Sequence, residues 1–85
     1  MTDVVIYSKK ICPYCDRAKE LLNKKNIAFT EIRVDLDEEQ YEIMLQRSKR
    51  RTVPQIFYKD TLIGGFDDLW ELEQKGELDK LIAGN

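Results

Sequence analysis

The chain has 85 residues, two cysteines and no histidine, and its 14 basic and 16 acidic side chains give a net charge of −2. A chain of this length has room for one core, so residues 1–85 are expected to form a single domain. A net charge this close to zero does not favour binding to nucleic acid or to a membrane surface. Two cysteines without a histidine do not make a four-ligand zinc site, and no metal site is expected.

The apolar run at residues 4–7 does not predict a secretory signal, because the apolar core of such a signal is about 7–15 residues long. No stretch is long enough to cross a bilayer. We therefore expect a cytoplasmic protein without a membrane partner. In that reducing compartment, two closely spaced cysteines are more typical of catalysis or metal binding than of a structural disulfide.

The first predicted elements are a strand and a helix. Residues 4–7 are apolar and mostly β-branched, which is typical of a central strand buried on both faces. Apolar side chains then recur at helical spacing from residue 13 to about residue 25. Asn26 is suited to end this helix in the left-handed conformation.

A second strand and a second helix follow. Residues 27–34 are rich in β-forming side chains and predict a strand, and Asp35 or Asp37 is placed to cap a helix that runs to about Ser48. A strand–helix–strand–helix order implies two parallel strands joined by right-handed crossovers.

The second half of the chain predicts a hairpin and two short helices. Residues 55–58 and 61–63 are β-forming runs around a two-residue polar turn. Asp67 or Asp68 is expected to begin a helix that ends at Gly76, and a last short helix follows. The whole pattern predicts an α/β fold, a four-stranded mixed sheet (βαβα then ββα) with helices on both faces.

The stretch Cys12-Pro13-Tyr14-Cys15 carries the chain's only cysteines. Proline suits the first turn of a helix, so the first cysteine is expected near the helix N-cap and the second one turn further in, facing inward. The positive end of the helix, together with nearby Lys9, stabilises a thiolate at the first cysteine. The stretch therefore predicts a reactive dithiol, with Cys12 as the nucleophile in thiol–disulfide exchange.

Thr52-Val53-Pro54 precedes the hairpin. Proline at the start of a strand leaves the backbone groups before it unpaired by the sheet and free to bind a ligand. Taken alone, the bond before Pro54 is expected to be trans, since only about 5–6% of such bonds are cis.

Two further segments each allow two interpretations. Gly64-Gly65-Phe66-Asp67-Asp68 is a glycine bend that runs into a helix start, where backbone N–H groups can hold a carboxylate and an aspartate can hold an ammonium. Taken alone, the segment is more simply a turn followed by a capping aspartate. Lys49-Arg50-Arg51 is a solvated loop or a group of charges that attracts an anionic ligand.

These motifs, in this order and at these separations, resemble the glutaredoxins, specifically the small bacterial dithiol type. The resemblance also includes Ile6-Tyr7-Ser8-Lys9 and covers essentially all of the chain. It implies a thioredoxin-like fold and a cis bond before Pro54. It further implies glutathione-dependent reduction of protein–glutathione mixed disulfides through Cys12 alone, and of protein disulfides through Cys12 with Cys15.

By the same resemblance, glutathione would bind beside Cys12. Its cysteinyl unit would pair with the Thr52–Val53 backbone, and its γ-glutamyl end would lie on the Phe66 and Asp67 amides, with the two aspartates near its amine. The implied glutathione contacts are Lys9, Tyr14, Thr52, Val53, Pro54, Gly65, Phe66, Asp67 and Asp68. Many relatives hold the glycine carboxylate with a basic or amide side chain at the position that Tyr41 occupies here. The candidates for that contact are Gln40, Lys9 and Arg51.

The resemblance implies glutathione as a co-substrate and no tightly bound cofactor. Its implied partners are glutathionylated or disulfide-bonded proteins, with ribonucleotide reductase as a family-level candidate, and glutathione reductase indirectly; a monomer is expected. One alternative is a thioredoxin-like protein that takes electrons from a flavoprotein reductase, although thioredoxins typically carry C-G-P-C. The other is a carrier of a glutathione-ligated iron–sulfur cluster, whose relatives usually have a single cysteine followed by G-F-S.

Overall fold

The computed structural model describes residues 2–83, which contain four strands and four helices. They are β1 (Val4–Ser8), α1 (Pro13–Lys24), β2 (Thr30–Arg33), α2 (Glu38–Ser48), β3 (Gln55–Tyr58), β4 (Thr61–Gly64), α3 (Phe66–Gln74) and α4 (Glu77–Ile82). The strands form one sheet in the order β2-β1-β3-β4, in which β1 and β2 are parallel and the other pairs antiparallel. The predicted mixed sheet and its element order are therefore confirmed.

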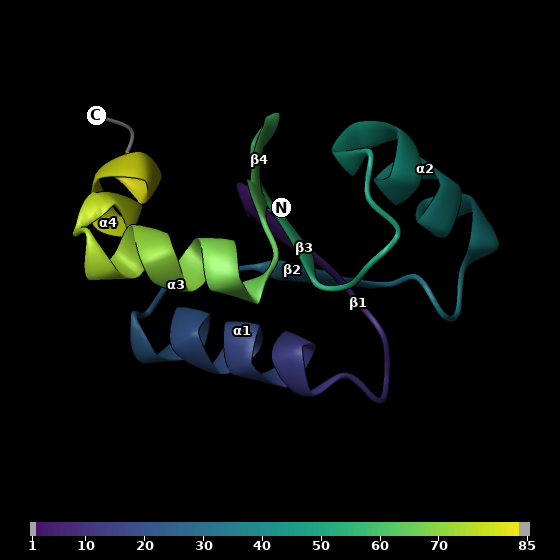
Figure 1. Ribbon diagram of the computed structural model, residues 1–85, viewed down its shortest axis with the longest axis horizontal. Coiled ribbons are helices and arrows are strands. Elements are labelled where there is room, and N and C mark those ends of the chain that lie inside the picture. The colour runs from purple at the N-terminus through teal and green to yellow at the C-terminus, as the bar shows by residue number, and fades with distance from the viewer. Residues whose placement is uncertain (1, 84–85) are drawn as a thin grey trace.

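Helices cover both faces of the sheet (Figure 1), and each face has its own apolar core. The α1/α3 core includes the buried side chains of Val4, Ile6, Ala18, Leu22, Ile56, Leu69 and Leu78. The α2 core is smaller and is built around Tyr7, Val34, Met44 and Phe57. Because β1 and β3 are covered on both sides, almost all of their residues are buried, as the apolar run at residues 4–7 predicts.

The end of α1 and the start of β2 differ from the predicted boundary. Asn26 has a φ of 57° and ends the helical segment as predicted. The N–H of Ile27 donates to the carbonyl of Leu22 at 2.9 Å, so the chain is still bonded to the helix at this point. As a result β2 begins only at Thr30 and is shorter than the predicted strand over 27–34.

Helix α2 begins directly after Asp37, one of the two residues predicted to cap it. The Asp37 carboxylate accepts a hydrogen bond from the N–H of Gln40 at 3.2 Å, which satisfies one of the unpaired donors of the first turn. Asp35 lies before the helix and pairs with Arg33 instead. Of the two possible caps, Asp37 is therefore the correct one.

The start of α3 was predicted wrongly at Asp67 or Asp68. The N-cap is Gly65, and Asp68, the third helical residue, reaches back to accept a hydrogen bond from the Gly65 N–H at 3.0 Å. This is the carboxylate half of a capping box. It moves the helix start to Phe66, so the N–H groups of Phe66 and Asp67 belong to the open first turn.

The helices in residues 2–83 are short. The longest, α1, has 12 residues, and none has both the length and the apolar character needed to cross a membrane. The first turns of α1 and α3 lie at the same end of the molecule, where the two helices run side by side (Figure 1). That end of the fold therefore holds the first turns of two helices.

Candidate active site

Cys12 is the N-cap of α1, as its position before proline predicts. Its backbone is extended, Pro13 is the first helical residue, and the Cys12 Sγ accepts a hydrogen bond from the N–H of Cys15 at 3.1 Å. Cys15 is completely buried one turn into the helix. Their Cα atoms are 5.1 Å apart and the structure joins the two sulfurs in a disulfide, so the pair has the proximity that thiol–disulfide exchange requires.

Cys12 is largely buried. Only 8% of it is accessible, although it is still the more accessible cysteine because Cys15 is at 0%. Its Sγ lies 3.8 Å from the carbonyl oxygen of Val53. The segment before Pro54 therefore partly covers the sulfur, a long-range contact that helical spacing alone does not reveal.

The bond between Val53 and Pro54 is cis, which agrees with the resemblance and not with the base rate. Gln55 follows, and its Nε2 donates to the Thr52 carbonyl at 3.0 Å and to the Thr52 hydroxyl at 3.3 Å. The Gln55 side chain is buried, and its Oε1 has no hydrogen-bond partner within the described chain. Gln55 thus fixes the Thr52 carbonyl, a function that sequence reasoning missed; a polar residue in a fully buried strand was the available signal.

The first turn of α3 faces this segment. Gly65 lies against Pro54, since a Cβ atom at Gly65 would come within 3.5 Å of the Pro54 carbonyl oxygen. The Phe66 ring stacks on Tyr14 of α1, with centroids 6.2 Å apart, and on Trp70 of α3, with centroids 6.3 Å apart. The resulting aromatic row, Tyr14–Phe66–Trp70, joins α1 to α3 beside the cysteines.

A groove of about 370 Å³ lies between these elements. Its lining residues are Tyr14, Arg50, Thr52, Val53, Pro54, Gln55, Gly65, Phe66, Asp67 and Asp68. It brings together the expected glutathione contacts with the exception of Lys9, which is exposed on the loop before Cys12 and does not line the groove. Arg50 and Gln55 are lining residues that were not among the expected contacts.

The candidates for the glycine carboxylate are not in the groove. Gln40, Lys9 and Arg51 do not line it, and Tyr41 packs against the α2 core. The role of these three side chains stays a prediction.

Two anchors hold the loop that leads to Cys12. In the first, Asp35 accepts two hydrogen bonds from the Arg33 guanidinium, at 2.6 and 2.7 Å, and one from the backbone N–H of Lys10 at 3.3 Å. The hydrogen bonds from Arg33 lower the pKa of Asp35 from 3.8 to about 2. Asp35 is therefore ionised over the whole physiological range and ties the loop to the end of β2.

The second anchor is at Ser8, the buried last residue of β1. Its hydroxyl donates to the Glu31 carboxylate at 2.6 Å, and Lys19 of α1 donates to the same oxygen at 2.9 Å. The hydrogen bond from Ser8, supported by Lys19, outweighs desolvation and lowers the pKa of Glu31. Glu31 thus links the two elements that flank the cysteine loop.

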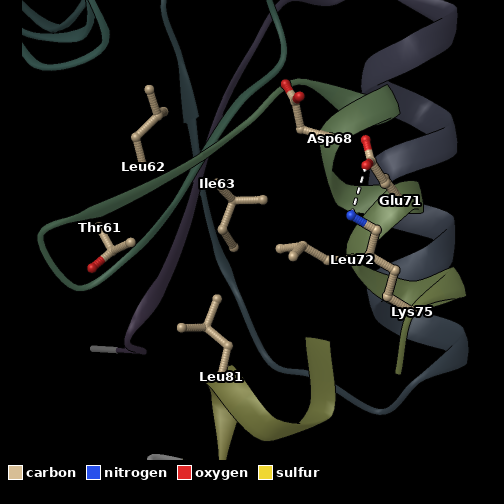
Figure 2. Close-up of a pocket in the computed structure, with 8 residues that line it drawn as sticks. All are labelled: Thr61, Leu62, Ile63, Asp68, Glu71, Leu72, Lys75 and Leu81. Atoms are coloured by element: carbon tan, nitrogen blue, oxygen red, sulfur yellow. Dashed lines mark ion pairs between the residues drawn. The ribbon is translucent and has the colours of Figure 1, made fainter. Parts of the chain in front are cut away.

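A second cavity, also about 370 Å³, lies between β4, α3 and α4 (Figure 2). It is lined by Thr61, Leu62, Ile63, Asp68, Glu71, Leu72, Lys75 and Leu81, and the Glu71–Lys75 ion pair of 3.0 Å lies on it. It shares only Asp68 with the groove and has none of the Thr52–Pro54 segment that lies against Cys12. In residues 2–83, no cluster of three or more histidine, cysteine, aspartate or glutamate side chains is arranged to hold a metal ion.

A dithiol at a helix N-terminus, set against a cis-proline segment in a mixed sheet, defines a thiol–disulfide oxidoreductase. The glutaredoxin family model matches residues 4–63. Over 82 residues the chain is 49% identical to glutaredoxin 3 of Escherichia coli K12, covering 96% of this chain and 99% of that protein. It is 46% identical over 83 residues to a glutaredoxin of Neisseria meningitidis, covering 96% and 98%. The chain therefore belongs to the glutaredoxin family.

Solved structures give the same result for the fold. A buckwheat glutaredoxin–glutathione complex superimposes with a TM-score of 0.89 at 29% identity, covering 96% of this chain and 77% of that one. The solution structure of Brucella melitensis glutaredoxin gives a TM-score of 0.83 at 48% identity, covering 96% and 89%. The thioredoxin-like fold and the glutathione-dependent thiol–disulfide oxidoreductase activity implied by the motifs are thus confirmed.

Proposed function

We propose that Cys12 is the nucleophile of this oxidoreductase, that Cys15 is its resolving cysteine, and that glutathione binds in the groove beside them. The observation that carries the proposal is the position of the Cys12 Sγ at the N-cap of α1, 3.8 Å from the Val53 carbonyl oxygen. Helix N–H groups stabilise a thiolate there, and the adjoining segment offers backbone groups to the substrate.

On a protein–glutathione mixed disulfide, only Cys12 is needed. Its thiolate attacks the glutathione sulfur, the old disulfide breaks, and the protein leaves as a thiolate that takes up a proton. A second glutathione, as its thiolate, then attacks the glutathione sulfur on Cys12. This step releases oxidised glutathione and restores the Cys12 thiolate, and glutathione reductase would recycle the product.

On a protein disulfide, both cysteines take part. The Cys12 thiolate attacks one sulfur and forms an intermolecular disulfide, which Cys15 breaks by attacking the Cys12 sulfur. The protein leaves with both thiols reduced, and the Cys12–Cys15 disulfide remains. Two glutathione molecules reduce that disulfide, forming one molecule of oxidised glutathione.

The groove offers complementary groups along its length. The backbone of Thr52 and Val53 can pair with the cysteinyl unit of glutathione, and Tyr14 can cover it. The open N–H groups of Phe66 and Asp67, at the positive end of α3, suit the γ-glutamyl carboxylate. A protein of the same fold, the buckwheat glutaredoxin, has been solved in complex with glutathione.

The two aspartates differ in what they can offer the γ-glutamyl amine. The Asp68 Oδ2 already accepts hydrogen bonds from Arg50 and from the Gly65 N–H. Asp67 is exposed, and its carboxylate has no hydrogen bond or ion pair among residues 2–83. We therefore assign the amine contact first to Asp67. Lys9 lies outside the groove and would contribute only its positive charge.

We propose that the protein works without a resident cofactor, as a cytoplasmic monomer that acts on glutathionylated or disulfide-bonded proteins. Ribonucleotide reductase is a candidate target only by analogy with the family. Thioredoxin-like coupling to a flavoprotein reductase is the competing electron source.

The decisive experiment is intact mass spectrometry after exposure to oxidised glutathione, with the wild type and Cys15→Ser compared. The variant should trap one glutathione on Cys12, whereas the wild type should lose it as the Cys12–Cys15 disulfide forms. If the variant forms no adduct, glutathione is not the co-substrate. An adduct that survives in Cys12→Ser would disprove the assignment of the nucleophile.

A further inference from the structure

Arg50 and Asp68 form an ion pair across one end of the groove. The Arg50 Nη1 lies 3.1 Å from the Asp68 Oδ2, and the same oxygen accepts the Gly65 N–H at 3.0 Å. Both side chains are 46% exposed and both line the groove. This contact, called here the Arg50–Asp68 bridge, therefore joins the loop after α2 to the first turn of α3.

Each end of the bridge is fixed to a helix. At one end, the buried hydroxyl of Ser48 accepts the N–H of Arg50 at 3.0 Å, and it lies 3.1 Å from the Arg50 carbonyl and 2.7 Å from the Met44 carbonyl. This holds the Arg50 backbone against the last turn of α2. At the other end, Asp68 is held by the capping box of α3. The bridge therefore connects two backbone segments that are each anchored to a helix.

Gly64 leaves the space that the bridge needs. Its φ of +117° is a conformation that side chains rarely adopt. A Cβ atom there would collide with the Asp68 carboxylate and come within 3.0 Å of the Arg50 guanidinium. The close approach of the two charges thus depends on the glycine bend before α3.

We propose that Arg50 is a positioning residue for glutathione recognition. Through the Arg50–Asp68 bridge it fixes the spacing between the Thr52–Pro54 segment and the first turn of α3. It also keeps Asp68 occupied as the cap of that helix, so that the N–H groups of Phe66 and Asp67 stay oriented toward the ligand. This inference rests on the proposed binding of the γ-glutamyl end at the α3 N-terminus.

The test compares two substrates, a short peptide whose cysteine carries glutathione and the same peptide carrying cysteinylglycine, which lacks the γ-glutamyl group. The variants are Arg50→Ala, Arg50→Lys, Asp68→Asn and the double variant Arg50→Ala/Asp68→Asn. Asparagine keeps an oxygen for the Gly65 N–H but has no charge for Arg50. Lys75→Ala is the matched control, because it removes an exposed ion pair at the other end of α3 (Figure 2).

Arg50→Ala should raise KM for the glutathione peptide up to about fivefold, the most that an exposed ion pair of this kind contributes. It should leave kcat, and KM for the cysteinylglycine peptide, unchanged. Arg50→Lys should recover most of the loss. The double variant should be no worse than the worse single variant, since both remove one interaction. Lys75→Ala should behave as the wild type.

Equal changes for both peptides, additive effects in the double variant, or an unchanged KM in Arg50→Ala would each overturn the positioning role. A variant that is too unstable is recognised from its thermal midpoint. In that case Asp68→Asn, which keeps the helix cap, replaces it: KM should rise for the glutathione peptide alone, and an unchanged KM would overturn the positioning role. The proposed function fails in a different way: the wild type itself would show no preference for the glutathione peptide.

Discussion

Two helices meet the groove with their N-termini, whereas α2 meets it with its C-terminus. Cys12 caps α1 and Gly65 caps α3, so unpaired N–H groups face the site from both. The last residue of α2 is Ser48, and the chain continues into Lys49, Arg50 and Arg51. The first two helix ends are positive and suit a thiolate and a carboxylate, but the third is negative.

The three helix ends therefore have different roles at the site. The α1 and α3 N-termini act on charge directly, and we assign them the sulfur and the γ-glutamyl carboxylate. The α2 end supplies no such field, and cationic side chains follow it instead. One of them, Arg50, crosses the groove to Asp68. The α2 side of the molecule thus contributes support, and substitutions there should affect stability or KM rather than the chemical step.

The largest effect should come from the α1 end. Cys12→Ser removes the nucleophile and should reduce the rates with both mixed disulfides and protein disulfides by about a thousandfold or more. Cys15→Ser is the matched control, since it should keep the first activity and lose only the second. Steady-state rates coupled to glutathione reductase measure both. Full activity in Cys12→Ser would show that the nucleophile does not lie at the α1 N-terminus.

On the α2 side, the largest effect should be on folding. Met44 is fully buried in the α2 core, and Met44→Ala should lower the free energy of unfolding by about 2–5 kcal/mol. Denaturant unfolding measures this loss. At a temperature where the variant is still folded, kcat should match that of the wild type. A loss of kcat without a loss of stability would contradict the division between the two sides.

A smaller effect, on KM, is expected from Gln55, which lies in β3 between the α2 side and the α1/α3 side of the sheet. Gln55→Met removes both hydrogen bonds to Thr52 and also removes the unpaired buried oxygen. We expect KM for glutathionylated peptide to rise about fivefold, the value of one typical hydrogen bond, without loss of stability. Kinetics and thermal unfolding of the same preparation test this. A marked loss of stability with KM unchanged would show that Gln55 serves the core only.

The smallest effect concerns the cysteine loop and depends on pH. The pKa of Asp35 is lowered from 3.8 to about 2 in the folded state, so its stabilising contribution is present above about pH 4. That contribution is lost as the pH falls toward about 2. The difference in denaturation midpoint between wild type and Asp35→Asn should therefore be constant at higher pH and shrink below about pH 4. A difference that is undiminished at about pH 2 would contradict this origin.

Sequence reasoning was reliable where the signal is local. Proline directly after Cys12 and helical spacing up to Cys15 were enough to place the dithiol at a helix start, and the apolar run at residues 4–7 marked an interior strand. It failed at the start of α3, because the predicted caps, Asp67 and Asp68, already lie inside the helix, and the Asp68 side chain folds back on Gly65, the actual N-cap.

The rest of the site depends on contacts between distant residues. Cys12 is covered by Val53, 41 positions later in the chain, and Arg50 meets Asp68 after 18 positions. No periodicity encodes such contacts. For the same reason, the basic group at residues 49–51 had two open interpretations from sequence, and the geometry favours different roles for Arg50, in the groove, and Arg51, outside it.

The aromatic row Tyr14–Phe66–Trp70 has a practical consequence. Trp70 is the single tryptophan of the chain and is 47% exposed, and it stacks on Phe66, which lines the groove. Any occupant that shifts the Phe66 ring changes the surroundings of the indole. The protein therefore carries its own fluorescent label at the groove, and the emission of Trp70 can follow occupancy in real time without a dye or a coupled enzyme.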